Sequence, residues 1–385
     1  VLLVLLLLGF LASKDYRVPH LAWIFIISSI PLGNFYIASV NTSSWLISGI
    51  GSFWYFCLLI LRVEKNNQRY AIVGAVLSAL VALSARSEAA PYLLISLIAI
   101  SFYGLRRSHL LERLTYLIVS GLVASLSIFL LSTSMAGRFA QTSFVYNDGT
   151  PIIRSARGVF MSNIQNIPSL FLGFMGGAPG LGQQDTEMAS IVPGCVVVVV
   201  GFLLLGSLVS TSRRIRATVL FVGTLLIVIP IYVFQKSSLL VGEEVLPRYI
   251  LPLWVLFLGL VIYERSFEYS RSQYVSMAIL LSVANSLALR QNLLRNTIGI
   301  DAYSVVDLNR ANEWWWKIGF IPSPMIVWFF GSLAMFVSIL VLTTMHGGTG
   351  GIRTPGPFEP SAFKADAFVH SATVPLRNAS ARSAL

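Results

Sequence analysis

The residues best suited to chemistry are charged side chains at the ends of apolar stretches. Arg86 and Glu88 stand two residues apart, between the apolar runs 71–84 and 90–105. An ionisable side chain between two membrane-embedded segments is costly to bury, so it often marks a functional site. A structural ion pair at the membrane interface is the alternative. Glu88 is therefore a candidate catalytic carboxylate, and Arg86 is a candidate substrate-binding residue.

A second cluster lies in the sequence GEEVLPRYILP at 242–252. Arg248 would stand at headgroup level, where a guanidinium can bind a phosphate through two parallel hydrogen bonds. The adjacent carboxylates Glu243 and Glu244 could act as acid and base or bind a hard cation. The alternative is an arginine that reaches the lipid headgroups beside two solvated glutamates. We expect all three, together with Tyr249, to belong to a substrate-binding site.

Two further sites precede apolar runs. Asp185 and Glu187 lie just before the run 192–211 and are candidate catalytic carboxylates. Acidic residues also simply mark the start of a helix, where they interact with its dipole. Trp314 and Trp315 begin a row of three tryptophans. They could stack on a sugar or a lipid, although such a row is commonly an interfacial aromatic belt.

The sequence predicts no metal site and no hydrolase triad. Neither the histidines nor the cysteines are placed for such roles. The cysteines lie in apolar runs, and the histidines lie on the expected inner side or near the carboxyl end: Cys57, Cys195, His20, His109, His346 and His370. We expect no resident cofactor, and only paired carboxylates leave room for a divalent cation.

The elements that must position these groups are membrane helices. Of 385 residues, 56% are apolar and only 11% are charged, whereas about 25% are charged in a soluble domain. A soluble enzyme, a fibrous protein and a disordered chain are thus excluded. We predict an all-α polytopic membrane protein whose apolar segments, about eleven in number, each approach the roughly 20 residues of a spanning helix. The segments are 1–12, 18–38, 43–61, 71–84, 90–105, 114–134, 192–211, 217–234, 249–264, 273–289 and 323–343. The pair 71–84 and 90–105 is short enough to be thin spans or a helical hairpin.

The basic residues predict the orientation. Thirteen Lys and Arg residues lie in five short loops, which should therefore face the cytoplasm. The net charge of +11 then reflects topology rather than a nucleic-acid partner. The longer loops 135–191, 235–248 and 290–322 face outward and contain half of the 16 acidic side chains. A transporter usually keeps its polar groups near mid-membrane, so this asymmetry favours a function at the outer rim.

The two ends of the chain differ from the rest. Residues 1–343 form the predicted membrane domain, whereas 344–385 are rich in Gly and Pro and then in Ala and Ser. We expect 344–385 to be a disordered cytoplasmic tail without a function of its own. Because Val1 opens the sequence inside an apolar run, we expect the chain to be truncated at its amino end.

Five short motifs in this order carry a family resemblance. They are ASVNTSSW at 38–45, ARSEA at 85–89, GLGQQDT at 180–186, PRYILP at 247–252 and NEWWW at 312–316. Over residues 1–343 the chain resembles a family of uncharacterised polytopic bacterial membrane proteins that is defined as a domain of unknown function. That family is in turn similar to the GT-C glycosyltransferases, which use polyprenyl-phosphate-linked sugars at the outer face of the membrane.

The resemblance implies a chemistry for the outer rim. An arginine placed like Arg248 could hold the leaving phosphate, and a carboxylate could deprotonate an acceptor hydroxyl. One departure is that GT-C enzymes carry a key acidic motif in the first outer loop, and we expect this chain to begin after that loop because we expect it to be truncated. Fold analogy alone does not establish function.

We therefore predict a GT-C-like glycosyltransferase of envelope glycan assembly at the outer face of the cytoplasmic membrane. Its expected partners are membrane lipids and a polyprenyl-phosphate-linked sugar, and no nucleic acid. A transporter or flippase for a lipid-linked sugar is one alternative, and it would show charges along a mid-membrane path. A non-catalytic membrane scaffold is the other.

Overall fold

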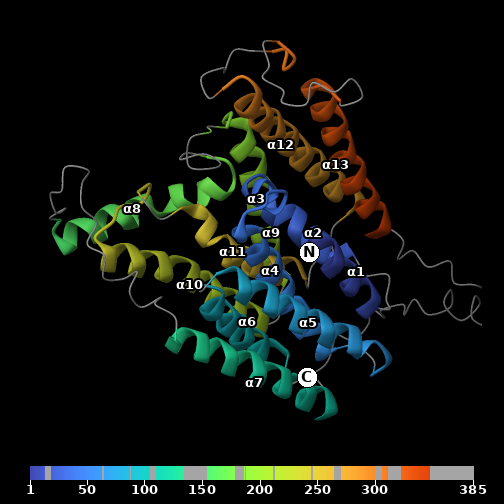
Figure 1. Ribbon diagram of the computed structural model, residues 1–385, viewed down its shortest axis with the longest axis vertical. Coiled ribbons are helices and arrows are strands. Elements are labelled where there is room, and N and C mark those ends of the chain that lie inside the picture. Colours follow the sequence, from blue (N-terminus) through green and yellow to red (C-terminus); the bar gives the residue numbers. More distant parts are fainter. Residues whose placement is uncertain are drawn as a thin grey trace, which may run out of the picture. The chain divides into compact units, whose positions relative to one another are not determined.

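A computed structural model of the chain describes thirteen segments. They are residues 1–13, 19–62, 65–86, 88–104, 110–133, 154–177, 186, 188–210, 213–243, 246–263, 270–299, 306–310 and 322–346. Within these segments the protein is built from thirteen α-helices and a short 3₁₀ turn (Figure 1). The prediction of an all-α polytopic membrane protein is confirmed.

Every predicted apolar segment contains a helix. In chain order these helices are α1 (Leu2–Ala12), α2 (Pro19–Ser29) with α3 (Leu32–Ile37), α4 (Thr42–Ile60), α5 (Lys65–Ala85), α6 (Ala89–Gly104), α7 (Leu110–Thr133), α9 (Ile191–Ser210), α10 (Arg213–Ser237), α11 (Leu251–Tyr263), α12 (Arg271–Thr297) and α13 (Pro324–His346). Among the described helices, six are long and apolar enough to cross a bilayer: α4, α5, α7, α10, α12 and α13. The apolar helices α1, α6 and α11 are shorter, and so is the stretch Ile191–Gly206 of α9.

Several boundaries differ from the prediction. The helix α5 has 21 residues, so the run 71–84 is only part of it, and at about 1.5 Å per residue it is long enough to span. The run 18–38 is divided at Pro31, which precedes the first residue of α3. The helices α10 and α12 extend into the predicted outer loops 235–248 and 290–322. Of the predicted tail 344–385, residues 344–346 end α13 and the others lie outside the described residues.

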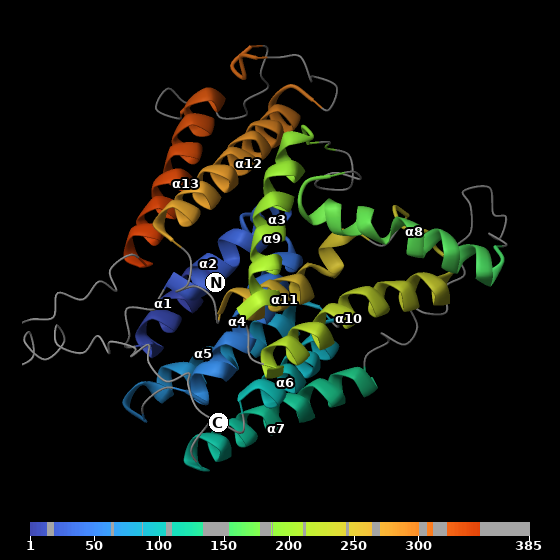
Figure 2. The same cartoon turned by 180° about the vertical axis from the view of Figure 1, so that it is seen from behind.

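The predicted outer loop 135–191 contains a helix that the apolar pattern did not reveal. This helix, α8 (Ala156–Phe174), begins after Ser155, whose hydroxyl accepts a hydrogen bond from the Gly158 amide. Polar residues recur along α8, so its composition is unlike that of a spanning helix. It is amphipathic instead, and it packs against α10 (Figure 2).

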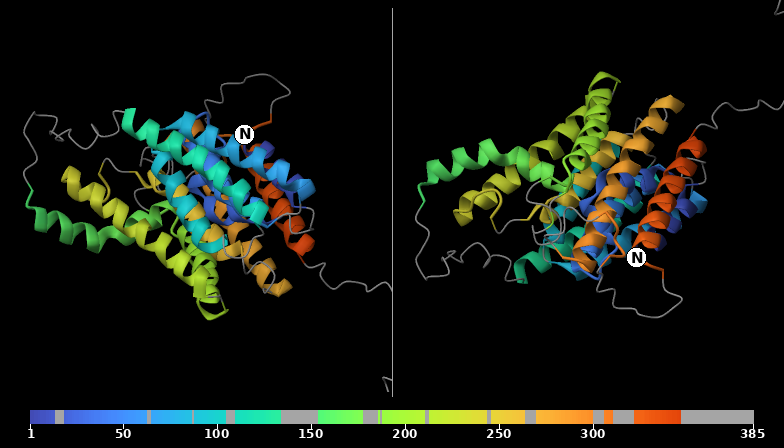
Figure 3. Two further views of the ribbon diagram at one scale, coloured as in Figure 1. Left: turned by 90° about the horizontal axis from the view of Figure 1, so that it is seen from below. Right: turned by 90° about the horizontal axis from the view of Figure 1, so that it is seen from above.

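The core is built around α4, which is buried along almost its whole length. The helices α5, α6 and α11 surround it. Small residues permit this close packing, since a Cβ added at Gly49 would lie 2.7 Å from the Ser78 carbonyl oxygen of α5. The pair α12 and α13 lies side by side (Figure 3) and joins the remaining helices through α9 and α2.

Candidate functional site

The chain brings the sequence motifs together where several helices begin or end. Arg86 directly follows α5, and Glu88 directly precedes α6. Arg248 and Tyr249 lie in the 3₁₀ turn η3 (Pro247–Tyr249), which leads into α11. Pro247 occupies the first position of this turn, where a missing amide hydrogen costs nothing and the fixed φ of proline suits a helical start.

Arg248 is held by two aromatic side chains. Its guanidinium carbon lies 5.2 Å from the ring centroid of Tyr249 and 5.6 Å from that of Tyr36. Its Nη1 donates a hydrogen bond of 3.3 Å to the Tyr36 hydroxyl, and its Nη2 donates one of 3.4 Å to the Tyr249 hydroxyl. Within the described segments no carboxylate pairs with Arg248, and its buried Nε has no hydrogen-bond partner. Among the described residues, the charge of Arg248 is therefore positioned but not neutralised.

Arg86 approaches the same tyrosine. Its guanidinium carbon lies 5.3 Å from the Tyr249 ring centroid, and its Nε donates a hydrogen bond of 3.2 Å to the Thr42 hydroxyl at the start of α4. The Arg86 Nη1 lies 3.9 Å from the Glu88 Oε1, and the Glu88 side chain is 44% exposed. Such a long, solvated ion pair contributes little. We name Arg86, Arg248 and Tyr249 the arginine site.

Both arginines change the acidity of Tyr249. Burial would raise the pKa of this phenol, but interactions with Arg248 and Arg86 favour its ionised form and outweigh burial. The net shift of the Tyr249 pKa is downward from its usual value of 10.0. A site that stabilises a negative charge on a phenol oxygen can also stabilise one on a phosphate oxygen, because both are held by the same guanidinium donors.

Buried polar side chains that sequence reasoning missed anchor the turn η3 and the segment before it. The Tyr92 hydroxyl of α6 donates to the Tyr249 carbonyl at 2.6 Å. The buried Asn163 of α8 donates to the Leu239 carbonyl and accepts from the Val241 amide, both at 2.8 Å. Nothing in the sequence marked these residues, since their partners lie 76 residues or more away. Sequence reasoning also missed Tyr36, which contacts Arg248. Thr42, which contacts Arg86, lies inside the motif at 38–45.

Glu243 binds a partner outside the arginine site. Its carboxylate forms a two-pronged ion pair with Arg154, both N–O distances being 2.7 Å. It also accepts a hydrogen bond of 2.8 Å from the Leu240 amide. The hydrogen bonds from Arg154 lower the pKa of Glu243 and outweigh the opposing effect of burial. The structure therefore gives Glu243 contacts that fix the loop before η3.

Several predicted site residues fall outside the described segments, and their predicted roles stay predictions: Asp185, Glu187, Glu244, Trp314 and Trp315. In the part of the chain that the structure describes, no group of three or more His, Cys, Asp or Glu side chains could hold a metal ion. Of the predicted ligand-binding residues, the structure thus brings together Arg86, Arg248 and Tyr249.

The chain also matches a known protein family. The family described as Predicted membrane protein (DUF2142) matches residues 1–257. The chain belongs to this family. The matched region contains the whole arginine site and ends within α11, whereas α12 and α13 follow it. No curated protein and no solved structure matches the chain.

Proposed function

We propose that this membrane protein is a GT-C-like glycosyltransferase that uses a polyprenyl-phosphate-linked sugar. The observation that carries the proposal is the convergence of Arg86 and Arg248 on Tyr249. Two guanidinium groups from distant parts of the chain face one small region, and Arg248 has no carboxylate partner among the described residues. This arrangement suits a phosphate, which can accept hydrogen bonds from both groups.

The charge pattern of the loops supports an outer-face location for the arginine site. The start of α4, the end of α5 and the turn before α11 all lie on the side that the positive-inside rule assigns to the exterior. A lipid phosphate that enters laterally from the bilayer would reach the arginines at headgroup level. We therefore propose action at the outer face of the cytoplasmic membrane, in envelope glycan assembly.

The proposed reaction has three parts. An acceptor hydroxyl attacks the anomeric carbon of the donor sugar, the bond between that carbon and the phosphate oxygen breaks, and polyprenyl phosphate leaves. The arginines stabilise the negative charge that develops on the phosphate. A carboxylate takes the hydroxyl proton, and Glu88 is the described candidate because it lies beside Arg86. Asp185 and Glu187 are the other candidates. No divalent cation is required in this scheme.

Binding of the lipid phosphate is the first test. The protein in nanodiscs is titrated with farnesyl phosphate and with farnesol, and the affinities are compared for the wild type, Arg248→Gln and Arg86→Gln. We expect a preference for the phosphate that falls by about tenfold in either variant, as for loss of a charge-assisted hydrogen bond.

A matched control comes from the other end of α5. Arg69 also lies on a tyrosine, with its guanidinium carbon 4.8 Å from the Tyr70 ring centroid, and Arg69→Gln should leave the affinity for farnesyl phosphate unchanged. Equal binding of farnesol and farnesyl phosphate would exclude the phosphate site. Transfer is then tested in a gene-deletion strain: if deletion alters the envelope glycan and the Arg248→Gln gene restores it fully, the proposed mechanism is wrong.

A further inference from the structure

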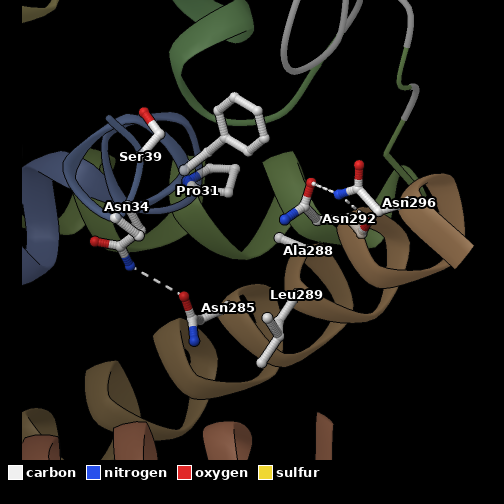
Figure 4. Close-up of a pocket in the computed structure, with 10 residues that line it drawn as sticks. Pro31, Asn34, Ser39, Asn285, Ala288, Leu289, Asn292 and Asn296 are labelled. Atoms are coloured by element: carbon white, nitrogen blue, oxygen red, sulfur yellow. Dashed lines mark hydrogen bonds between the residues drawn. The ribbon is translucent and has the colours of Figure 1, made fainter. Parts of the chain in front are cut away.

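A second polar site lies between α3 and α12. A cavity of about 420 Å³ opens there, and it is lined from α3 and its flanks by Pro31, Asn34, Phe35, Ala38 and Ser39, and from α12 by Asn285, Ala288, Leu289, Asn292 and Asn296 (Figure 4). Four of its ten lining residues are asparagines, and none is charged. The family motifs do not include the residues of α12.

The asparagines are held in two pairs. The Asn34 Nδ2 donates to the Asn285 Oδ1 at 3.0 Å. The Asn296 Nδ2 donates to the Asn292 carbonyl at 2.9 Å and to its Oδ1 at 3.3 Å (Figure 4). Each amide can make more hydrogen bonds than these. Within the described segments, the Nδ2 groups of Asn285 and Asn292 and the Oδ1 of Asn34 have none, so donors and an acceptor remain for a ligand.

The position of these amides is unusual for a helix of this kind. The helix α12 is long and apolar enough to cross a bilayer, and Asn285 lies in its predicted span 273–289, where polar side chains are costly. Asn292 and Asn296 lie in the part of α12 that extends beyond this span, and asparagine is a poor helix former. Asn285, Asn292 and Asn296 nevertheless recur at helical spacing on one face, with Ala288 between them. The small side chain of Ala288 leaves room in the middle of that face.

The chemistry of the cavity selects a class of ligand. Fixed amide donors and acceptors match the hydroxyl groups of a sugar, and the absence of charge in the lining does not favour an ion. Phe35 supplies an apolar wall on which the C–H face of a sugar ring can pack, and its own ring is fixed edge-on against Tyr36 at 5.3 Å. Tyr36 in turn accepts a hydrogen bond from Arg248, so one short helix contacts both sites.

We propose that this cavity binds an uncharged sugar unit. The inference deepens the proposed function, since it assigns the sugar-binding part of the substrate, but the cavity can bind a sugar whether or not the arginines bind a phosphate. The sugar could belong to a free acceptor glycan or to the lipid-linked donor, and the two arms of the test separate these sources.

In the first arm, purified protein is applied to an array of lipid-free neutral and acidic glycans. In the second, nanodiscs are titrated with polyprenyl phosphate and with polyprenyl-phosphate mannose. Both arms use Asn292→Leu, which removes one amide, and Ala288→Leu, which fills the cavity without removing any hydrogen bond. We expect either variant to weaken neutral-sugar binding by about tenfold, as for the loss of one or two hydrogen bonds between the cavity and the sugar.

The matched control is Asn166→Leu on α8. Asn166 donates to the carbonyl four residues earlier at 2.8 Å, as Asn296 does, but it lies on a different helix and outside the cavity. Cavity-dependent binding in the first arm identifies an acceptor, and in the second arm it identifies the donor sugar. If neither arm shows binding of a neutral sugar that both cavity variants weaken, the inference is overturned. The phosphate site is judged separately, by the affinity of Arg248→Gln for farnesyl phosphate, so failure of the phosphate site and failure of the sugar site are distinguishable.

Discussion

Tyr92 donates a hydrogen bond of 2.6 Å to the main-chain carbonyl of Tyr249, across 157 residues of sequence. The bond ties α6 to the turn η3 through the backbone of that turn, and it leaves the Tyr249 side chain free to face both arginines. Because Arg248 is the preceding residue, its direction depends on this anchor. The geometry of the arginine site is thus set partly by a residue that touches neither guanidinium group.

Replacing Tyr92 by Phe removes only the anchoring hydroxyl. We expect the variant to lose about 1 kcal/mol of stability, as for one buried hydrogen bond, and to bind farnesyl phosphate more weakly than the wild type. Thermal unfolding in detergent and the nanodisc titration measure the two effects. The exposed Tyr232 offers a control, since Tyr232→Phe should change neither quantity. An unchanged affinity in Tyr92→Phe would show that the anchor does not position Arg248.

The ion pair between Arg154 and Glu243 should make stability depend on pH. The pKa of Glu243 is lowered in the folded protein, so its contribution is present above the unfolded pKa of about 4.5 and is lost as the pH falls through the folded value. We expect Glu243→Gln to unfold at a lower temperature than the wild type at pH 7. The difference should shrink as the pH is lowered below about 4. A difference that is constant with pH would contradict this assignment.

The sequence predicts the helices well and their polar contacts poorly. Long apolar runs report membrane helices directly, because no other element can satisfy its backbone so simply in lipid. The amphipathic helix α8 was not predicted because it lacks a long apolar run. Arg86 and Arg248 were recognisable as charges at helix ends, but their meeting at Tyr249 depends on packing between distant segments. The partner of Glu243 was likewise hidden, since Arg154 lies 89 residues earlier.

The lowered pKa of Tyr249 can be measured directly. Its phenol should ionise at a lower pH than an ordinary tyrosine, because the effects of Arg248 and Arg86 outweigh burial. The difference in phenolate absorbance between the wild type and Tyr249→Phe isolates this residue from the other tyrosines. We expect Arg248→Gln to move that titration upward. A Tyr249 that titrates at or above its usual pKa of 10.0 in the wild type would contradict the geometry of the site.

The close approach of α11 to α4 at Gly259 should tolerate no larger residue. A Cβ at Gly259 would collide with the indole of Trp54, a fully buried side chain that also packs edge-on against Tyr263 with ring centroids 6.4 Å apart. We expect Gly259→Ala to destabilise the protein by about 1–3 kcal/mol, as for other overpacked cores. At Gly121 on α7 an added Cβ meets nothing within 4 Å, so Gly121→Ala should be neutral or stabilising by up to about 1 kcal/mol. Thermal unfolding of the two variants measures the contrast, and equal unfolding temperatures would show that the two helices do not pack this closely.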